Sequence, residues 1–580
     1  MCAPAEACLD REKDREGPDP SAEVWGAEER RVTSLGKEAP EDPCLEQPPE
    51  GRGAPTKEGM KKFILGTEGR GTEALKANSS PGIDGCTAGA FVLFKRLALV
   101  LPSLIQSNQG AFVRGRSIAH NIMILQDLIK NYGRAITSPR CAMQIDISKA
   151  YDTVDWLFLE NLLKSFCFPM KFIGWVMNCI RNTNYFLLLN GRVQGSFMGK
   201  RGLRQGDSMS PLLFVIIMEY LTRSIQWASR SPHFRFHPMC KSINLINLCF
   251  ADDIILFCKG TIGDVNVLKD ALGLFSEASG LLINSMKSMV YFGGVPVEDK
   301  REICQLLTLS EGFFPLHYLG VPLRPTKWKH SDCEVIVQKM RTKLFSWSSK
   351  HLSYAGRLLL IHSVLFGLRN FWMNVFILPQ SIIKEVDKLC RQFLWGASGT
   401  RSKLHFASWQ QVCLPKAFGS LGLRDGSRWN RALLAKYVWA VTNKQDTLWV
   451  KWIQHVYLKG ADFWSYGLKP DTSWYWRKLC HLRNKFSKEE VMAAGISRKF
   501  KPALLYNSSL NQQLVAYKRA IWSRSILPKH RFVLWMVVNS FLLTRDNLTK
   551  ANLQISSLLC PVCDEHLESH QHLFFDCSYP

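Results

Sequence analysis

Apolar residues recur with helical spacing along much of the chain from residue 91 onward. Gly280 follows one of these patterns directly, as is typical of the residue that ends a helix. The spacing predicts helices at residues 97–105, 118–129, 149–166, 210–225 and 264–279.

Short apolar runs bounded by polar turns predict strands at residues 141–147, 243–250 and 254–257. Beyond about residue 325 the pattern is mostly helical and the chain is rich in tryptophan. The sequence contains no internal repeat. This order of elements indicates an α+β core followed by helical domains.

The first 60 residues differ in composition from the rest of the chain. They are rich in Glu, Pro, Gly and Ala and poor in aromatic residues, so they bury too little apolar surface to fold, and we expect disorder. They carry 8 Lys and Arg against 15 Asp and Glu, whereas the whole chain has a net charge of +25. Residues 61–580 therefore carry +32, which favours a polyanionic partner, nucleic acid before an anionic membrane.

No segment predicts export or a membrane span. The N-terminus lacks a basic stretch followed by an apolar one, and no run reaches the roughly 18–20 apolar residues of a span. The 18 cysteines are scattered, which is typical of buried thiols in a reducing compartment. A nuclear or cytoplasmic location is therefore expected.

Acidic residues stand at the ends of predicted strands. Asp252 and Asp253 form the tip of a hairpin, and Asp146 comes at the end of the strand over 141–147. Considered alone, Asp252-Asp253 has the pattern of an ordinary turn, and Asp146 has that of a residue at the start of a helix. Taken together, strand pairing would bring three carboxylates to one sheet edge, as phosphoryl transfer with two Mg²⁺ ions about 3.5–4 Å apart requires.

Four segments follow one another along the chain at residues 144–156, 202–214, 250–253 and 280–288. In this order they resemble the palm motifs of reverse transcriptases from LINE-type (non-LTR) retrotransposons, especially those of plants. The resemblance extends from about residue 80 to the C-terminus. It implies an RNA-directed DNA polymerase with an RNA template, a DNA primer and dNTPs as partners. Motif A is matched by residues 144–156, motif B by 202–214, motif C by Phe-Ala-Asp-Asp at 250–253 and motif D by 280–288.

The resemblance implies a role for each matched residue of motifs A and C. Asp146, Asp252 and Asp253 would hold two Mg²⁺ ions, with the carbonyl of Ile147 as a further ligand. Tyr151 matches the ring that stacks under the sugar and leaves no room for a 2′-hydroxyl. Its alternative role is that of a core tyrosine.

Motifs B and D supply further residues. Gln205 and Gly206 would line the nascent base-pair pocket, where glycine permits close backbone approach. Lys287 would lie near the leaving pyrophosphate as a general acid or charge clamp, and Arg204 would meet phosphate. For Arg204 and Lys287 the alternative is a solvated surface charge.

Segments on either side of these motifs also match the family. Arg114 and Arg116, which flank a glycine, would contact the template backbone. Residues 317–323 match the passage from palm to thumb, which would grip the primer, and residues 352–357 and 412–425 match the helical region beyond. Basic and aromatic residues there suit a heteroduplex surface; the alternative is a Trp-rich core with solvated charges.

The last cysteines have the spacing of a metal site, Cys-x2-Cys followed by His-x4-Cys. Four such ligands can close a tetrahedral Zn²⁺ site. His566 and His570 are alternative fourth ligands, and unmetallated thiols are a further possibility. The arrangement resembles the zinc-binding module that ends plant LINE-type reverse transcriptases, and the resemblance assigns one structural Zn²⁺ to Cys560, Cys563, His572 and Cys577.

The sequence departs from the family at the fingers. Residues 80–85, Ser-Pro-Gly-Ile-Asp-Gly, resemble the element that opens the fingers, but Phe94-Lys95 then runs directly into residues 96–102. The expected strand pair and F-R-P-I-like box, which supply basic residues to the dNTP triphosphate and template, are missing. The family's N-terminal endonuclease is also absent, so we expect a degraded or mispredicted copy.

Together these observations predict an α+β fold with a right-hand polymerase palm (an antiparallel sheet with packed helices), truncated fingers, a helical thumb and connector, and a small zinc module. The expected boundaries are 1–75 for the disordered segment, 76–324 for fingers and palm, 325–500 for thumb and connector, and 501–580 for the zinc module. A non-catalytic nucleic-acid-binding remnant of a retroelement is the alternative that the missing fingers box favours. A group II intron maturase-like protein is a further alternative, but the zinc module and the downstream segments match LINE-type elements better.

Overall fold

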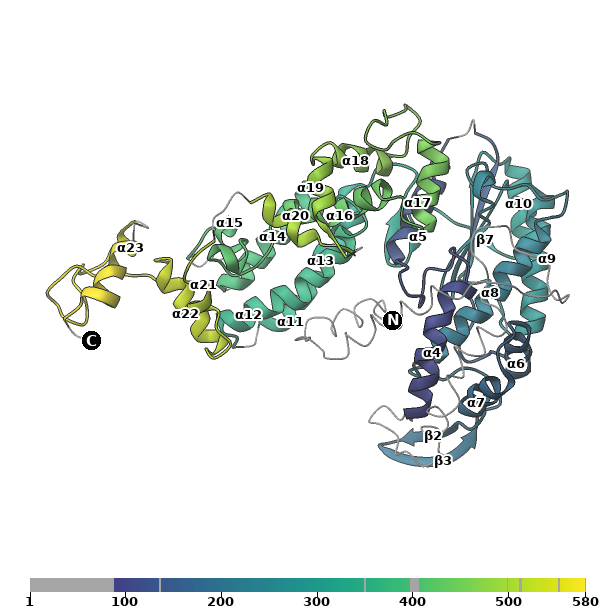
Figure 1. Cartoon of the computed structure of the whole chain (residues 1–580), viewed down its shortest axis with the longest axis horizontal. Coiled ribbons are helices and arrows are strands. Elements are labelled where there is room, and N and C mark those ends of the chain that lie inside the picture. The colour runs from purple at the N-terminus through teal and green to yellow at the C-terminus, as the bar shows by residue number, and fades with distance from the viewer. Residues whose placement is uncertain are drawn as a thin grey trace, which may run out of the picture.

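A computed structural model describes residues 88–134, 137–348, 351–396, 406–497, 499–510, 514–550 and 553–578. The chain forms a body that contains a sheet, and a long helical arm extends from it to a small C-terminal module (Figure 1). The disorder expected for residues 1–75 and the fingers element at 80–85 lie outside the described residues.

A five-stranded sheet in the order β4-β5-β1-β6-β7 forms the centre of the body. The first four strands of this order pair in antiparallel fashion, and β7 pairs with β6 in parallel. The strands run over Arg140–Ile145 (β1), Asn247–Phe250 (β4), Asp253–Cys258 (β5), Met289–Gly293 (β6) and Ser310–Glu311 (β7).

Successive residues of the central strands face two different cores. In β5, Ile254 and Leu256 belong to the core of the body's helices, whereas Ile255 and Phe257 belong to the core shared with α5 (Ile118–Leu128) and the arm. Because both faces are covered, the central strands are mostly apolar rather than alternating.

Helices pack on the first face and end at recognisable caps. Thr261 and Asp264 form a capping box at the start of α9, and Gly280, with φ 75°, ends that helix as predicted. The helices predicted at 97–105, 210–225 and 264–279 are confirmed. The elements are α4 (Ala88–Leu104), α6 (Trp156–Ser165), α7 (Met170–Arg181), α8 (Ser210–Ala228), α9 (Ile262–Ser279) and α10 (Val297–Leu307).

The helix predicted at residues 149–166 is wrong at its start, because α6 begins only at Trp156. Asp155 caps this helix, its carboxylate accepting the backbone N–H three positions on at 2.7 Å. The preceding residues form turns and pair with the segment before α8, where the N–H of Leu203 donates to the carbonyl of Tyr151. These long-range hydrogen bonds prevail over the local helical pattern and bring motif B beside motif A.

Several strand limits also differ from the prediction. The strand predicted at residues 243–250 begins only at Asn247, because the chain forms a short 3₁₀ helix up to Ile243. β1 ends at Ile145, two residues earlier than expected. The turn after β4 contains only Ala251 and Asp252, because Asp253 already pairs with Phe250. Ala251 has φ 55°, the left-handed conformation that lets so short a turn close.

The arm confirms the helical, Trp-rich pattern beyond residue 325. Its fully buried side chains include Trp395, Trp449, Trp452, Trp476 and Trp535. A small hairpin, β8 (Leu316–Tyr318) and β9 (Val321–Leu323), leads into it. The helices are α11 (His330–Ser348), α12 (Tyr354–Leu360), α13 (Phe366–Met373), α14 (Gln380–Trp395), α15 (Trp409–Val412), α16 (Gly426–Thr442), α17 (Leu448–Ile453), α18 (Trp474–Arg483), α19 (Lys488–Ala493), α20 (Pro502–Ser508), α21 (Lys518–Ile521), α22 (Pro528–Val538) and α23 (Arg545–Lys550).

Helix α5 belongs to the core of the arm although it precedes the sheet in the sequence. Its buried Asp127 accepts hydrogen bonds from the hydroxyl of Ser473, from Trp452 Nε1 at 2.9 Å and from the hydroxyl of Tyr457 at 3.0 Å. The expected boundary between residues 324 and 325 therefore runs between segments that share one hydrophobic core.

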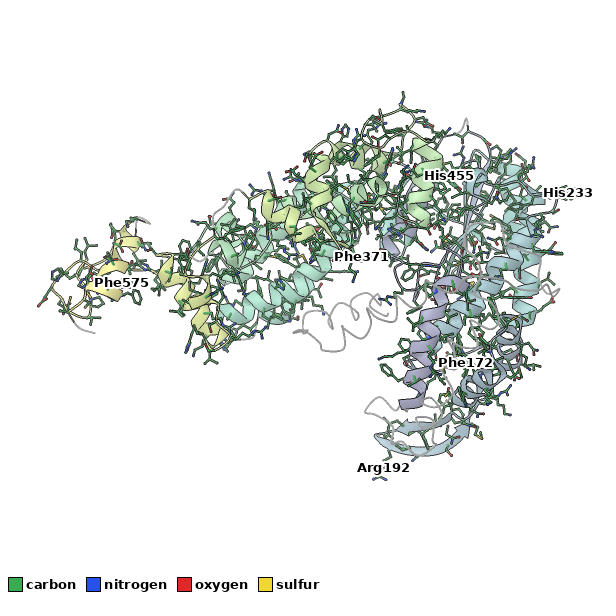
Figure 2. The ribbon with its side chains drawn as sticks, viewed as in Figure 1. Phe172, Arg192, His233, Phe371, His455 and Phe575 are labelled. Carbon is green, nitrogen blue, oxygen red and sulfur yellow. The ribbon has the colours of Figure 1, made fainter. Side chains whose placement is uncertain are left out.

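The hairpin of β2 (Asn184–Leu189) and β3 (Arg192–Met198) projects from the end of the body beyond α7, with Arg192 at its far end (Figure 2). No other described strand pairs with it. Its exposed side chains include Phe186, Leu188 and Phe197. An isolated two-stranded hairpin is marginally stable, and an exposed apolar patch typically marks a surface that another segment or molecule covers.

The α+β class is confirmed by the sheet and its packed helices. Nine of the 14 cysteines recorded as free thiols in the described residues are buried, in agreement with the expected thiol chemistry. Within the described ranges, no helix combines the length and apolarity that crossing a bilayer requires.

Candidate functional site

Asp146, Asp252 and Asp253 meet at one edge of the sheet. Strands β1 and β5 are antiparallel and Ile145 pairs with Ile254, so the end of β1 adjoins the start of β5. Asp146 therefore lies beside Asp253, and Asp252 occupies the preceding turn. The convergence of the three acids follows from this register.

The loop of motif D holds the backbone of Asp146 on both sides. The N–H of Asp146 donates to Ser288 Oγ at 3.0 Å, and its carbonyl accepts the N–H of Asn284 at 2.8 Å. The buried Ser288 hydroxyl in turn donates to the carbonyl of Asn284 at 2.7 Å. The sequence prediction missed both residues, and their only signal was membership of motif D.

A buried amide network supports the turn that carries the other two acids. Gln109 Oε1 accepts the N–H of Ala251 at 3.1 Å, and Asn121 Nδ2 donates to the carbonyl of Cys249 at 2.8 Å. The N–H of Gly110 donates to the same carbonyl at 2.8 Å. The sequence placed this segment near the template, but the structure adds a supporting contact with the acidic turn.

The acids repel one another in this geometry. Desolvation and the charges of Asp252 and Asp146 raise the pKa of Asp253 to about 6. Desolvation and the charge of Asp146 also raise the pKa of Asp252. Both side chains remain exposed, so a cation can reach them and relieve the repulsion.

The three carboxylates form an open cluster rather than a closed cage. The ligand atoms of Asp146, Asp252 and Asp253 do not all lie within 4.8 Å of one another. In the described part of the chain, clusters of three or more His, Cys, Asp or Glu residues that meet this distance occur at the C-terminal cysteines and at His330, Glu334 and Glu385. The donor set still fits hard cations, because it consists of carboxylates and a nearby backbone carbonyl.

A cavity of about 430 Å³ opens beside the acids. Its size falls in the usual range of pockets that hold a small ligand. Residues from four sequence motifs line it: Asp146, Ile147, Tyr151, Gln205, Asp252 and Lys287, with Ser148, Lys149, Ala150 and Asn284. Of the other predicted residues nearby, Asp253, Gly206 and Arg204 are not part of this lining.

Tyr151 stands half-buried at the cavity wall. Its ring stacks on Phe214 with centroids 4.8 Å apart, and desolvation together with the charge of Asp252 raises its pKa. Gln205 Nε2 donates to Asp152 Oδ1 at 3.4 Å. Gly206 adopts φ 96°, a conformation that L-residues rarely take.

The three predicted arginines have different surroundings. Arg116 donates to the backbone carbonyls of Ile105, Gln106 and Gln109 at 2.5–2.7 Å, and desolvation lowers its pKa to about 10. Those contacts tie the end of α4 to the next segment and account for the residue structurally. Arg114 and Arg204 are exposed.

The downstream segments contribute to the core of the arm. Residues 317–323 form the β8–β9 hairpin, whose buried residues include Tyr318. In the segment over 412–425, the Arg424 guanidinium lies 3.6 Å from the centre of the Trp429 ring, and Lys416 lies over a tryptophan ring as well. These contacts favour a packing role for the two cations.

The C-terminal module brings the four predicted zinc ligands together. Backbone N–H groups of Glu565 and His566 lower the pKa of Cys563 to about 6, which favours the thiolate that a metal requires. Cys563 Sγ lies 3.2 Å from His572 Nε2. The ligand atoms of Cys560, Cys563, His572 and Cys577 all lie within 4.8 Å of one another.

The two alternative histidines lie outside this cluster. His570 Nε2 lies 3.2 Å from the carbonyl of Leu542, so this buried ring is held by the backbone. His566 is exposed and stacks on His572 with centroids 5.3 Å apart. The arrangement therefore agrees with His572 as the fourth ligand and fits a tetrahedral zinc site.

Two family models match the chain over the regions just described. Residues 91–323 match "Reverse transcriptase (RNA-dependent DNA polymerase)", and residues 500–580 match "zinc-binding in reverse transcriptase". The first match contains the acid cavity, and the second contains the cysteine cluster.

Three relatives illustrate the similarity. The chain is 37% identical to the "Putative ribonuclease H protein" of Arabidopsis thaliana over 25% of this chain and 24% of the relative. It is 24% identical to the Transposon TX1 uncharacterized 149 kDa protein of Xenopus laevis over 52% and 23%. It is 23% identical to the retrovirus-related Pol polyprotein from the type-2 retrotransposable element R2DM of Drosophila melanogaster over 52% and 29%. The chain thus spans less than a third of the length of each relative.

Proposed function

We propose that this chain is the RNA-directed DNA polymerase of a LINE-type retrotransposon, because residues 91–323 match the reverse transcriptase family model and residues 500–580 match that of the zinc-binding modules of reverse transcriptases. The reaction adds dNMP to the 3′-hydroxyl of a primer on an RNA template and releases pyrophosphate. The observation that carries the proposal is the single cavity that four separate motifs line together.

The acids at this cavity suit two Mg²⁺ ions. Asp146, Asp252 and Asp253 offer oxygen ligands, and the carbonyl of Ile147 adjoins them. When bound, the ions supply activation of the primer hydroxyl and stabilisation of charge on the phosphoryl and leaving groups. The raised pKa of Asp253, caused by desolvation and the neighbouring acids, supports a site that gains stability from a cation.

The remaining residues of the cavity position the nucleotide. The Tyr151 ring, held by Phe214, fills the space that a ribose 2′-hydroxyl would need. Gln205 contacts the nascent base pair, with the neighbouring Gly206 allowing close approach. Lys287 lies in the lining and orients or protonates the leaving pyrophosphate. Arg114 and Arg204, both exposed, meet phosphates of the template and the dNTP.

The zinc module carries one structural Zn²⁺ and serves to hold RNA or to engage the target site. Its four ligands come from a stretch too small to build a large core, so the metal would supply much of its stability. The matches that end at residue 323 and begin at residue 500 support palm and zinc domains close to 76–324 and 501–580.

Primer extension tests the polymerase proposal. The full chain, given an RNA template, a DNA primer, dNTPs and Mg²⁺, should extend the primer, and Asp252→Asn should reduce the rate by about 1000-fold because an essential charge is lost. Glu298→Gln, on the exposed surface of α10, is the matched control and should extend normally. Wild-type product no greater than that of Asp252→Asn would contradict polymerase activity.

A non-catalytic nucleic-acid-binding remnant is the second candidate, and the β2–β3 hairpin favours it. Its exposed apolar residues are what the loss of neighbouring fingers strands would leave uncovered. In that case wild type and Asp252→Asn would bind a primer–template equally and neither would extend it. A labelled primer–template measured in both assays separates the two functions.

A further inference from the structure

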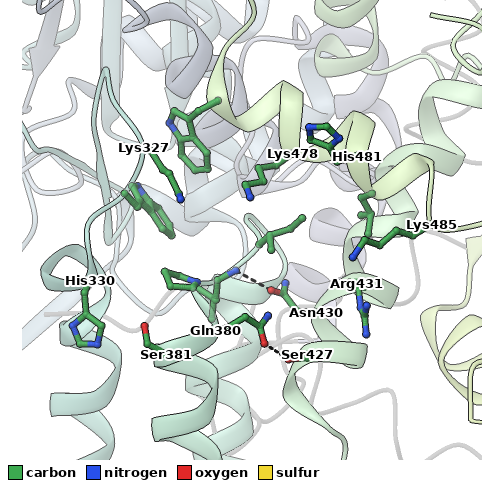
Figure 3. Close-up of a pocket in the computed structure, with 16 residues that line it drawn as sticks. Lys327, His330, Gln380, Ser381, Ser427, Asn430, Arg431, Lys478, His481 and Lys485 are labelled. Carbon is green, nitrogen blue, oxygen red and sulfur yellow. Dashed lines mark hydrogen bonds between the residues drawn. The ribbon is translucent and has the colours of Figure 1, made fainter. Parts of the chain in front are cut away.

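The helical arm contains a second and larger pocket, with a volume of about 840 Å³ (Figure 3). It lies where the loop before α11 meets the first turn of α14, the first turn of α16 and the helix α18. The lining residues of this arm pocket and of the acid cavity have no member in common. The pocket therefore needs an explanation of its own.

The charged residues that line the arm pocket are all basic. Lys327 and Lys478 extend into it from different elements, with their ammonium groups toward one another (Figure 3). Arg431 and Lys485 line the same pocket, with two histidines, and no Asp or Glu belongs to the described lining. Like charges gathered in this way repel one another unless an anion is bound.

Helix N-termini add to the positive potential. The lining includes the first residues of α11, α14 and α18 and the second residue of α16. Pro379 precedes α14 and makes no side-chain cap, so the leading N–H groups of that helix have no capping side chain. An N-terminus without a capping side chain favours phosphate oxygens, and α14 supplies it here, because Asp425 caps α16 and Ser473 caps α18.

The wall of the pocket is fixed before any ligand arrives. The buried Asn430 accepts the N–H of Leu378 at 2.9 Å and donates to the carbonyls of Met373 and Phe376 at 2.8 and 3.0 Å. Ser427 Oγ donates to Gln380 Oε1 at 2.7 Å, and Figure 3 draws this bond beside that of Asn430. A preformed site loses little entropy on binding.

We propose that the arm pocket binds a single-stranded segment of nucleic acid. Its cations suit phosphates, and the half-buried Trp474, Ile377 and Pro379 offer apolar surface to bases. The buried Trp328, Leu378 and Leu482 complete the apolar wall. A duplex keeps its bases inside and would present only phosphates to this apolar wall. This inference rests on the proposed function only for the source of the strand, which we expect to be the part of the RNA template outside the heteroduplex. The pocket would then be a second site of contact with nucleic acid, besides the acid cavity.

Binding of a fluorescent oligonucleotide to the full chain tests the proposal. The arms are a 12-nucleotide single-stranded RNA, a single-stranded DNA of the same sequence, and the duplex of that DNA, all without dNTPs or Mg²⁺. The variant Lys327→Gln/Lys478→Gln should weaken single-strand binding about tenfold and reduce the salt slope of log K by about 1.4, or about 0.7 per contact. Lys339→Gln/Lys388→Gln changes two exposed lysines of α11 and α14 outside the lining and should bind like the wild type.

Cross-linking supplies a second readout that does not depend on a variant. A 5-iodouridine oligonucleotide bound to the wild-type chain should cross-link to peptides that contain Trp328 or Trp474. Cross-links confined to other peptides, equal binding by both double variants, or an equal loss of duplex and single-strand binding would each overturn the proposal. Preference for the RNA arm would identify the template as the source of the strand, and preference for the DNA arm would identify the product strand.

The two proposals fail in distinguishable ways. If the chain has no polymerase activity, Asp252→Asn and wild type give equal extension while the arm-pocket variant still loses single-strand binding. If the pocket is not a nucleic-acid site, the arm-pocket variant binds normally whatever the extension assay gives.

Discussion

Gln109 Oε1 accepts the backbone N–H of Ala251 at 3.1 Å. Ala251 is the left-handed residue immediately before Asp252, and Gln109 is buried behind it. A side chain 142 positions earlier in the chain therefore holds the turn that presents two of the three acids. A buried hydrogen bond of this kind defines where the acids point, although it touches neither substrate nor metal.

Gln109→Ala should slow primer extension by about 10- to 100-fold, because small displacements of catalytic groups have effects of that size. The change should appear in kcat, with KM for the primer–template almost unaffected, since Gln109 lies behind the turn. Steady-state kinetics and thermal unfolding check it, and Gln305→Ala on the exposed face of α10 is the control. A fall in Tm with unchanged kcat would restrict Gln109 to a folding role.

Ser288→Ala should affect both stability and the metal site. The substitution leaves the N–H of Asp146 without its acceptor, at a cost of about 1–3 kcal/mol in the free energy of unfolding. It should also weaken Mg²⁺ activation of primer extension, because the Asp146 backbone loses one of its two tethers. Denaturant unfolding and Mg²⁺ titration measure the two effects. Ser285→Ala, in the exposed part of the same loop, should change neither.

Tyr151→Ala should relax discrimination against ribonucleotides. Without the ring, the space beside Phe214 can accept a 2′-hydroxyl, and the ratio of dNTP to rNTP incorporation should fall by up to about 100-fold, the size of a selection based on one hydroxyl. Tyr151→Phe keeps the ring and should keep the selectivity. Single-nucleotide incorporation assays decide between them, and unchanged selectivity in the alanine variant would make Tyr151 a core residue.

The zinc module gives a prediction that separates neighbouring histidines. His572→Ala and Cys560→Ser should remove about one equivalent of zinc from the full chain, because each takes away one of four ligands. His570→Ala should keep the metal, since its ring contacts the Leu542 carbonyl instead. Elemental analysis of the purified variants measures this directly. Zinc loss in His570→Ala with retention in His572→Ala would exchange their roles.

Asp127 should make the stability of the arm depend on pH. Burial raises the pKa of Asp127 from its ordinary value of 3.8 to about 6. Three hydrogen bonds to the carboxylate lower the pKa, but their effect is smaller than that of burial. Between about pH 4 and 6 the folded chain therefore holds more protons than the unfolded chain, and the contribution of Asp127 to the free energy of unfolding falls as the pH rises. Above about pH 6 that contribution is constant.

Thermal unfolding between pH 4.5 and 7.5 tests the direction, with Asp127→Asn as the comparison. The amide cannot ionise, so the variant should show a flatter pH dependence across this window. Identical pH profiles for the two proteins would exclude titration of Asp127 in this range.

The convergence of the acids could be predicted because Asp146 follows one short apolar strand and the pair Asp252-Asp253 lies between two others, and antiparallel pairing joins the end of one strand to the start of the next. The start of α6 could not, because residues 149–155 have a helical pattern yet bond to Leu203 across some 50 positions of sequence. The tether of Asp146 by Ser288 was equally hidden, since a serine in a loop carries no signal for a partner 142 positions away.

The sequence by itself determined the α+β class, the order of the four motifs and the Cys-x2-Cys and His-x4-Cys spacing of the C-terminal module, because these depend on local patterns and short spacings. Only the tertiary structure decided that Gln109 supports the acidic turn, that α5 shares a core with the arm and that Lys327, Arg431 and Lys478 line one pocket. Such contacts join segments far apart in the chain. These contacts form because folding buries apolar surface and pairs buried polar groups, whatever the distance between the partners in the sequence. A local sequence pattern therefore cannot predict them.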